Sequence, residues 1–209
     1  MKPRDGTMTI FNEYRVSNIL NKDGTVNYYG KILSSEEANQ YFGLLMQNIL
    51  WEKDEVIIFG KHIATKRKAA WYGDSEYLYT YSNTTKQALA WTKELSELKQ
   101  IVEELAGIKF NSCLVNLYHN GNEGMGWHSD DEKPLGKNNT IASLSFGAEQ
   151  TFSFKHKQTE QTVSFVLEHG SLLIKKDAIQ SNWLHSLPKS KNITQSRINL
   201  TFRTIHEPQ

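Results

Sequence analysis

Apolar and polar side chains alternate with a period of two residues in the back half of this chain, and this pattern limits the folds available to it. Beyond residue 109 the alternation recurs at residues 152–155, 163–167 and 197–203, with turn signals such as His169-Gly170 between the runs. A period of two places successive side chains on opposite faces of a strand. Short strands separated by turns favour a sandwich or barrel. We therefore expect a jelly-roll core over about residues 110–205.

Two helices are expected ahead of this core. Residues 34–37, with the sequence Ser-Ser-Glu-Glu, are typical of a capping box, and the helix they begin should run to about Asn48. A second helix is predicted from about Thr85 to Leu105, where Gly107 suits a helix end. The pattern predicts an α+β fold, mostly β, in which N-terminal helices pack on the jelly-roll.

Composition excludes several classes of protein. The 209 residues suit one domain over 1–209, and the net charge of +1 provides no global field for a polyanion. The single cysteine, Cys113, excludes an intrachain disulfide framework. We find no apolar stretch that could cross a bilayer and no secretory signal at the N-terminus. We expect a monomer without a membrane partner, cytoplasmic, or nuclear if the source is a eukaryote.

A metal site is indicated by two histidines and an aspartate. His128 and Asp130 are two positions apart, so on an extended segment both side chains can reach one ion, and His185 follows several strands later. Two imidazoles and a carboxylate suit non-haem Fe(II) and leave positions open for a co-substrate and O2. An isolated His-x-Asp motif is weak evidence for a metal site, so the assignment depends on the residues that surround it. The unchosen histidines are interpreted as surface or loop residues: His119, His156, His169 and His206.

The run 197–203 predicts a strand with a binding face. Its polar members are Arg197, Asn199, Thr201 and Arg203, and its other face is apolar. Burying two arginine side chains costs free energy unless anions pair with them. A dicarboxylate would pair with them through two parallel hydrogen bonds. Asn116 and Tyr118 show the same spacing and provide neutral donors. The alternative is an edge strand with solvated arginines.

These residues resemble the AlkB family of Fe(II)- and 2-oxoglutarate-dependent dioxygenases. With front segments included, the resemblance covers about residues 56–205, and its matching segments in the back half are 116–118, 128–132, 142–147, 183–188 and 197–203. It implies a double-stranded β-helix that holds Fe(II) through His128, Asp130 and His185. It implies that Arg197, with Tyr118 and Asn199, holds the far carboxylate of 2-oxoglutarate, while Arg203 and Asn116 lie near the iron.

Residues 50–85 resemble the nucleotide-recognition lid of the family branch that acts on duplex DNA. A basic cluster there could contact phosphates, and Phe59 could be a wedge that replaces a flipped base. The cluster consists of Lys61, Lys66, Arg67 and Lys68. The alternatives are a core role for Phe59 and a solvated turn for the basic cluster. Ala69 stands where that branch carries a longer polar residue, which weakens the case for identical handling of the opposite strand.

Aromatic residues and one carboxylate are the candidates for base binding. Tyr77, Tyr79 and Tyr81 alternate on one face and could sandwich a base, with Trp71 or Tyr72 nearby. Ordinary strand packing is the alternative for this stripe. Glu132 lies where the family reads the base edge, and a carboxylate there would favour a positively charged alkylated base.

The function implied by the resemblance is DNA repair. The enzyme would demethylate 1-methyladenine and 3-methylcytosine with Fe(II), 2-oxoglutarate and O2, releasing succinate, CO2 and formaldehyde. The same chemistry could instead act on RNA or on a protein side chain. A third hypothesis is a non-catalytic jelly-roll binding module, which the complete ligand set disfavours.

Overall fold

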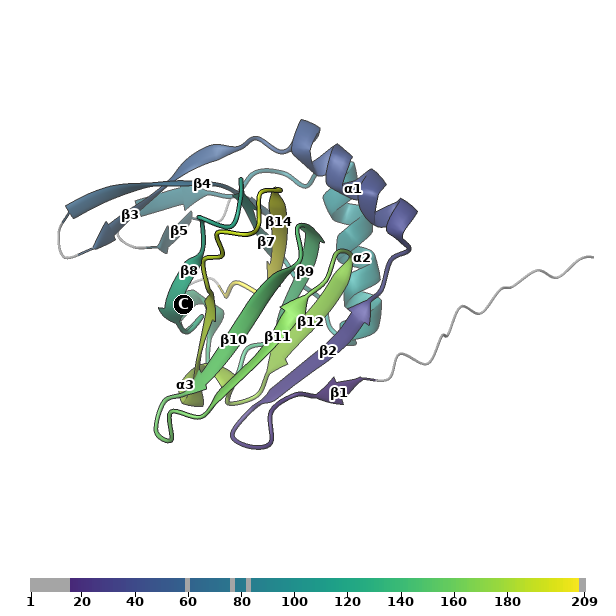
Figure 1. The fold of residues 1–209 in the computed structure, drawn as a ribbon. Coiled ribbons are helices and arrows are strands. Elements are labelled where there is room, and N and C mark those ends of the chain that lie inside the picture. The colour runs from purple at the N-terminus through teal and green to yellow at the C-terminus, as the bar shows by residue number, and fades with distance from the viewer. Residues whose placement is uncertain (1–15, 59–60, 76–77, 82–83, 207–209) are drawn as a thin grey trace, which may run out of the picture.

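The computed structural model describes residues 16–206 apart from 59–60, 76–77 and 82–83 (Figure 1). Within that range the fold is mostly β, and its named strand pairs are all antiparallel. The larger sheet has the strand order β1 (Ser17–Asn18), β2 (Thr25–Lys31), β12 (Ser171–Lys176), β9 (Ile141–Gly147), β14 (Arg197–Arg203), β7 (Ser112–Tyr118), β4 (Lys61–Gly73) and β3 (Glu52–Ile58).

A smaller sheet faces the larger one. It has the order β11 (Thr162–Leu167), β10 (Gln150–His156), β13 (Trp183–Leu187) and β8 (Met125–His128). A separate hairpin joins β5 (Leu78–Tyr81) to β6 (Thr84–Gln87). The two facing antiparallel sheets confirm the predicted jelly-roll core.

Two long helices cover the outer face of the larger sheet, on the side away from the smaller sheet (Figure 1). They are α1 (Ser35–Asn48) and α2 (Lys93–Ala106). Two short helical segments follow later in the chain: η1 (Lys133–Leu135) and α3 (Ile179–Asn182). The capping box is confirmed, because Ser34 Oγ accepts from the Glu37 amide while the Glu37 carboxylate accepts from the Ser34 amide. No helix among the described residues combines the length and apolar character needed to span a bilayer.

The predicted start of the second helix is wrong. Residues 84–87 form strand β6, and α2 begins only at Lys93, where the Thr92 hydroxyl accepts from the Leu95 amide. β-branched Thr84 and Thr85 suit a strand, and pairing with β5 satisfies their backbone. The predicted end is correct, since Gly107 has a left-handed backbone at φ 70°.

Strand β14 separates the hydrophobic core from the cavity between the sheets. Ile198, Leu200 and Phe202 pack in the core formed with the two helices. The alternate residues of β14 line a pocket between the sheets. Because β14 lies between β9 and β7, it is a central strand, and the edge-strand alternative for its arginines is wrong.

Candidate metal centre and co-substrate pocket

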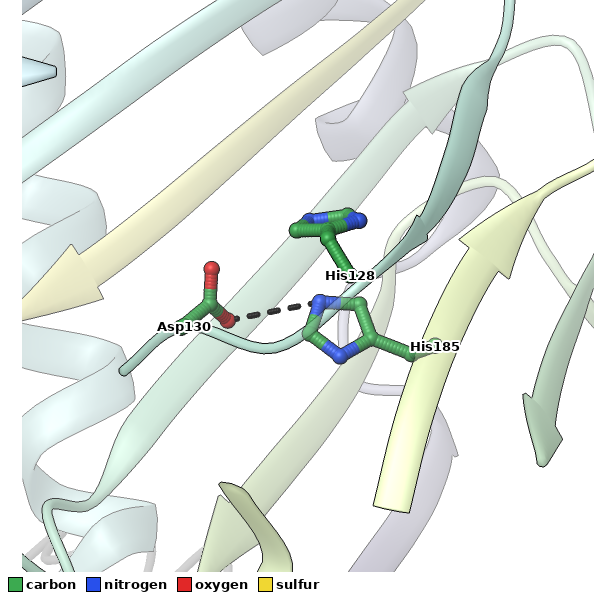
Figure 2. A group of neighbouring side chains, drawn as sticks. All are labelled: His128, Asp130 and His185. Atoms are coloured by element: carbon green, nitrogen blue, oxygen red, sulfur yellow. Dashed lines mark ion pairs between the residues drawn. The ribbon is translucent and has the colours of Figure 1, made fainter. Parts of the chain in front are cut away.

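Three side chains from the smaller sheet and the following loop converge at one end of the pocket. His128 ends β8 and pairs in register with His185 of β13, while Asp130 lies two residues beyond β8. Their potential ligand atoms all lie within 4.8 Å of one another. Figure 2 shows Asp130 facing His185, with Asp130 Oδ2 3.4 Å from His185 Nε2. The prediction that these three residues meet is confirmed.

Neighbouring groups orient the three ligands. His128 Nδ1 lies 2.8 Å from the Gly126 carbonyl oxygen, which fixes the ring and leaves Nε2 for an ion. The Asp130 amide donates to Gln180 Oε1 at 2.9 Å. The Phe154 ring packs against the His185 ring, with 6.1 Å between the two ring centres. This support holds the ligand set in place before any ion binds.

Two cations pair with the Asp130 carboxylate. Arg203 donates to Oδ1 at 3.0 Å, and Lys175 of β12 donates to Oδ2. Burial raises the pKa of the Asp130 carboxyl, but the nearby Lys175 and Arg203 charges outweigh it, so the pKa stands well below its usual value. Burial, reinforced by Lys175, holds the pKa of His185 well below its usual value, and burial lowers the pKa of His128. An ionised carboxylate and neutral imidazoles are the protonation states that metal ligands need.

The far end of the pocket holds an arginine without a carboxylate partner in the described part of the chain. Arg197 is 2% exposed, and its Nη2 donates to Ser145 Oγ at 2.8 Å and Asn199 Oδ1 at 3.0 Å. Its Nε has no hydrogen-bond partner. Burial lowers the pKa of Arg197 to about 10. A buried guanidinium with an unused donor suits a carboxylate ligand, so the pocket fits 2-oxoglutarate.

The other predicted co-substrate residues border the same pocket. Arg197 pairs in register with Tyr118, and Asn199 pairs with Asn116, so the two strands place their polar side chains side by side. The Arg197 guanidinium carbon lies 5.8 Å from the centre of the Tyr118 ring. All six residues predicted to bind the co-substrate are among those that line the pocket: Asn116, Tyr118, Arg197, Asn199, Thr201 and Arg203.

Two of the front residues, Arg67 and Tyr72, lie elsewhere than predicted. Arg67 is 6% exposed and forms an ion pair with Asp54, so its assignment to a phosphate-binding cluster is wrong, whereas Lys66 is exposed. Trp71 lines the pocket. Tyr72 is one residue on, faces the opposite side of β4, and accepts a hydrogen bond from the Leu50 amide in the helix-side core. Because side chains alternate along a strand, Tyr72 lies outside the pocket that Trp71 lines.

Some candidates lie outside the described residues. Phe59 and Tyr77 are among the residues that the structure does not describe, and of Tyr79 and Tyr81 only the strand β5 is described. Lys61 is likewise described only as part of β4, and Lys68 is half-buried. Glu132 lines the pocket, and its Oε2 is buried without a hydrogen-bond partner.

Sequence reasoning overlooked Lys175 and Asp54, and it misplaced His156. Lys175 is the fifth residue of β12 and directly follows the apolar residues Leu172, Leu173 and Ile174. Its place two residues after Leu173, on the same face of the strand, was the available signal. Nothing in the local sequence marks Asp54. His156 ends β10 and is 2% exposed, with Nε2 3.1 Å from Asp23 Oδ2, so its interpretation as a surface or loop residue is wrong.

Comparisons with known proteins agree with this geometry. A sequence model of the 2OG-Fe(II) oxygenase superfamily matches residues 25–203. The human protein "Alpha-ketoglutarate-dependent dioxygenase alkB homolog 3" is 38% identical over 188 residues, which cover 85% of this chain and 65% of that protein. The mouse protein "DNA oxidative demethylase ALKBH2" is 36% identical over 197 residues, which cover 89% of this chain and 82% of that protein.

A solved structure supports the fold. "The structure of OsALKBH1" superposes with a TM-score of 0.61 at 14% identity, covering 90% of this chain and 99% of that one. The chain thus spans slightly under two thirds of the human relative and most of the mouse relative. Together with the converging His128, Asp130 and His185, the matches identify the cofactors as Fe(II) and 2-oxoglutarate. The chain therefore belongs to the AlkB family of the 2OG-Fe(II) oxygenase superfamily.

Proposed function

We propose that this protein repairs DNA by oxidative demethylation of N-alkylated bases, with 1-methyladenine and 3-methylcytosine as substrates. The observation that carries the proposal is one pocket that contains the metal ligands, a buried arginine and a carboxylate with one buried oxygen that has no hydrogen-bond partner. The similarity to proteins named DNA oxidative demethylase favours DNA among the possible substrates. The products would be the repaired base, formaldehyde, succinate and CO2.

The chain's own residues would bind and order the cofactors. His128, Asp130 and His185 would hold Fe(II), and Arg197 would hold the far carboxylate of 2-oxoglutarate, with Tyr118, Asn199 and Thr201 beside it. Asn116 and Arg203 would border the iron-proximal end. When bound, Fe(II) and 2-oxoglutarate would allow O2 to act as the oxidant: one oxygen atom enters the N-methyl group, and the other enters succinate as CO2 leaves 2-oxoglutarate. The resulting N-hydroxymethyl group is then lost as formaldehyde.

Glu132 and Trp71 would recognise the damaged base. A methyl group on the Watson–Crick edge of adenine or cytosine leaves the ring positively charged, and the unpaired Glu132 Oε2 would favour that charge over a neutral base. Trp71 provides an aromatic surface in the pocket wall. Arg67 is neutralised by Asp54 and lies 5.7 Å from the Tyr118 ring centre, so it would support the wall.

The hairpins β3–β4 and β5–β6 would form a lid over the substrate. Figure 1 shows β3, β4 and β5 extending beyond the barrel on the side of β8. Phe59 lies between β3 and β4 in the sequence, as a base-replacing wedge requires, and the exposed Lys66 would contact phosphate. Tyr79 and Tyr81 on β5 would extend the aromatic surface.

The direct test is demethylation of a defined oligonucleotide. The protein is loaded anaerobically with Fe(II) and 2-oxoglutarate, then exposed to air with a single-stranded oligonucleotide that carries one 1-methyladenine. We expect mass spectrometry to show loss of one methyl group, abolished in His128→Ala and retained in the control His206→Ala, whose histidine is exposed. Succinate formation without methyl loss would redirect the search to RNA or protein substrates.

The wedge has its own test. Phe59→Ala should lower demethylation of duplex DNA at least tenfold and leave single-stranded DNA nearly unaffected, because only a duplex leaves a gap where the base was. Initial rates on matched single- and double-stranded oligonucleotides measure the difference. An equal loss on both substrates would assign Phe59 to the structure of the lid instead.

A further inference from the structure

A lysine ammonium lies among the metal ligands. Lys175 of β12 has a side chain that is 4% exposed. Its Nζ donates to Asp130 Oδ2 and lies 3.3 Å from His185 Nε2. These are the two ligands that face each other in Figure 2. Two of the three ligand side chains therefore direct lone pairs at one ammonium group.

The ammonium and a divalent ion compete for the same lone pairs. A neutral imidazole has one acceptor nitrogen, so His185 Nε2 can face the Lys175 ammonium or an ion but not both. A positive charge a few ångströms from a second cation also weakens binding of that cation, most strongly in a buried site. Arg203 already neutralises the other Asp130 oxygen at 3.0 Å. The carboxylate therefore does not need Lys175 once a metal ion is bound.

The pocket contains a second acceptor for the ammonium. Glu132 lines the same pocket, and its Oε2 is buried without a hydrogen-bond partner. The carboxylate of Glu132 is close enough to act electrostatically on Lys175. The lysine side chain is a flexible four-carbon stem, so the ammonium can move while β12 stays paired to β9 and β2.

We propose that Lys175 is a displaceable internal cation that competes with the divalent metal for Asp130 and His185. In the metal-free protein it neutralises Asp130 and keeps the ligands ordered. Metal binding moves the ammonium toward Glu132, so the affinity for metal is lower than the three ligands alone would provide. The proposal rests on the cofactor assignment, and its test contains no nucleic acid, so a failure of DNA demethylation would leave it standing. Because Glu132 would accept both cations, a positively charged base would compete with the displaced Lys175 ammonium for that carboxylate.

The test is a metal titration without nucleic acid. Lys175→Met keeps the length of the side chain and removes its charge. Lys176→Met is the matched control, because Lys176 is the next residue on β12, is half-buried, and does not line the pocket. We expect calorimetry with Mn(II) at fixed pH to show binding at least about tenfold tighter for Lys175→Met, and unchanged for Lys176→Met. Equal or weaker binding by Lys175→Met, or no binding by any of the proteins, would overturn the proposal.

Two further measurements do not depend on the stability of Lys175→Met. Glu132→Gln should weaken Mn(II) binding in the otherwise wild-type protein. The same substitution should have little effect in the Lys175→Met variant, because no lysine ammonium is then present for Glu132 to accept. A crystal structure of the wild-type protein with Mn(II) should place Lys175 Nζ beyond hydrogen-bonding distance of Asp130 Oδ2 and His185 Nε2. Retention of both contacts with the ion present would refute displacement.

Discussion

At the scale of single residues, this fold uses histidines in two different ways. In the pocket, burial lowers the pKa of His185 and His128 and keeps them neutral for a metal. Outside the pocket, His169 connects the end of β9 to α1. Its Nδ1 accepts from the Gly147 amide at 2.9 Å, and its Nε2 lies 3.2 Å from Asn39 Oδ1. Neutral imidazole is required for that acceptor role.

The stability of the metal-free protein should depend on the protonation of His169. Burial, reinforced by Lys31, lowers the pKa of His169, so the unfolded chain takes up a proton more readily. Its contribution is complete above about pH 6.5, falls as the pH drops through that value, and stops falling below the folded pKa. Because the His169 ring is partly exposed, we expect its protonation to lower the free energy of unfolding by no more than about 1 kcal/mol.

Urea unfolding with a chelator at pH 7.5, 6.5 and 5.5 measures this dependence. His128 and His185 contribute a loss in the same direction, so the difference between wild type and His169→Gln isolates the single ring. The variant should be less stable at pH 7.5 and should lose less stability on acidification. His206→Gln, at an exposed position, is the control. Parallel pH curves for wild type and His169→Gln would contradict the prediction.

At the scale of elements, alternation along a strand decides which residues serve the pocket and which serve the core. On β4, Trp71 faces the pocket, whereas the adjacent Tyr72 packs under the helices. On β14, the arginines and Asn199 face the pocket, and the apolar residues between them face the core. One strand thus carries a binding surface and a hydrophobic surface at the same time.

Trp71 and Tyr72 should separate activity from stability. Tyr72→Phe removes the acceptor of the Leu50 amide, which should cost about 1 kcal/mol of stability and leave demethylation unchanged. Trp71→Leu should lower kcat/KM for the methylated oligonucleotide about tenfold, because a flat aromatic surface is lost. Urea unfolding and initial rates measure both effects. A loss of activity in Tyr72→Phe without any change in stability would show that the two faces are assigned the wrong way round.

At the scale of the whole molecule, the site joins the two sheets. His128 and His185 come from the smaller sheet, whereas Arg197 and Arg203 come from the larger one. A ligand that contacts both groups should therefore hold the sheets together. Ligands that bind only the folded state stabilise it by about 2.7 kcal/mol at a hundredfold excess over Kd.

Mn(II) and 2-oxoglutarate should raise Tm in two separable steps. Each step should be about 5–10 °C for a chain of this size at a hundredfold excess over Kd. Arg197→Met should keep the Mn(II) step and lose most of the 2-oxoglutarate step, because the guanidinium that meets the far carboxylate is absent. Thermal denaturation under anaerobic conditions measures both. A full 2-oxoglutarate step in Arg197→Met would exclude Arg197 as the main carboxylate contact.

Much of the site could be predicted because it depends on local patterns. The alternation in residues 197–203 predicted a strand with opposite faces, and the spacing of His128 and Asp130 predicted a shared ion. The capping signals of Ser34 and Gly107 predicted two helix ends correctly. Each of these features follows from backbone geometry within a few residues, so it can be read without knowing the rest of the fold.

Tertiary structure alone decided which charges meet. Arg67 belongs to a basic run in the sequence, yet the hairpin β3–β4 brings it to Asp54 and into the pocket. Lys175 looks like an ordinary strand residue, yet the sandwich places its ammonium between Asp130 and His185. Such contacts join residues 10 to 45 positions apart and depend on how the strands pair and pack. The order of residues along each strand set its two faces and the side-chain chemistry on each face, and the packing of the two sheets set which partner each buried charge contacts.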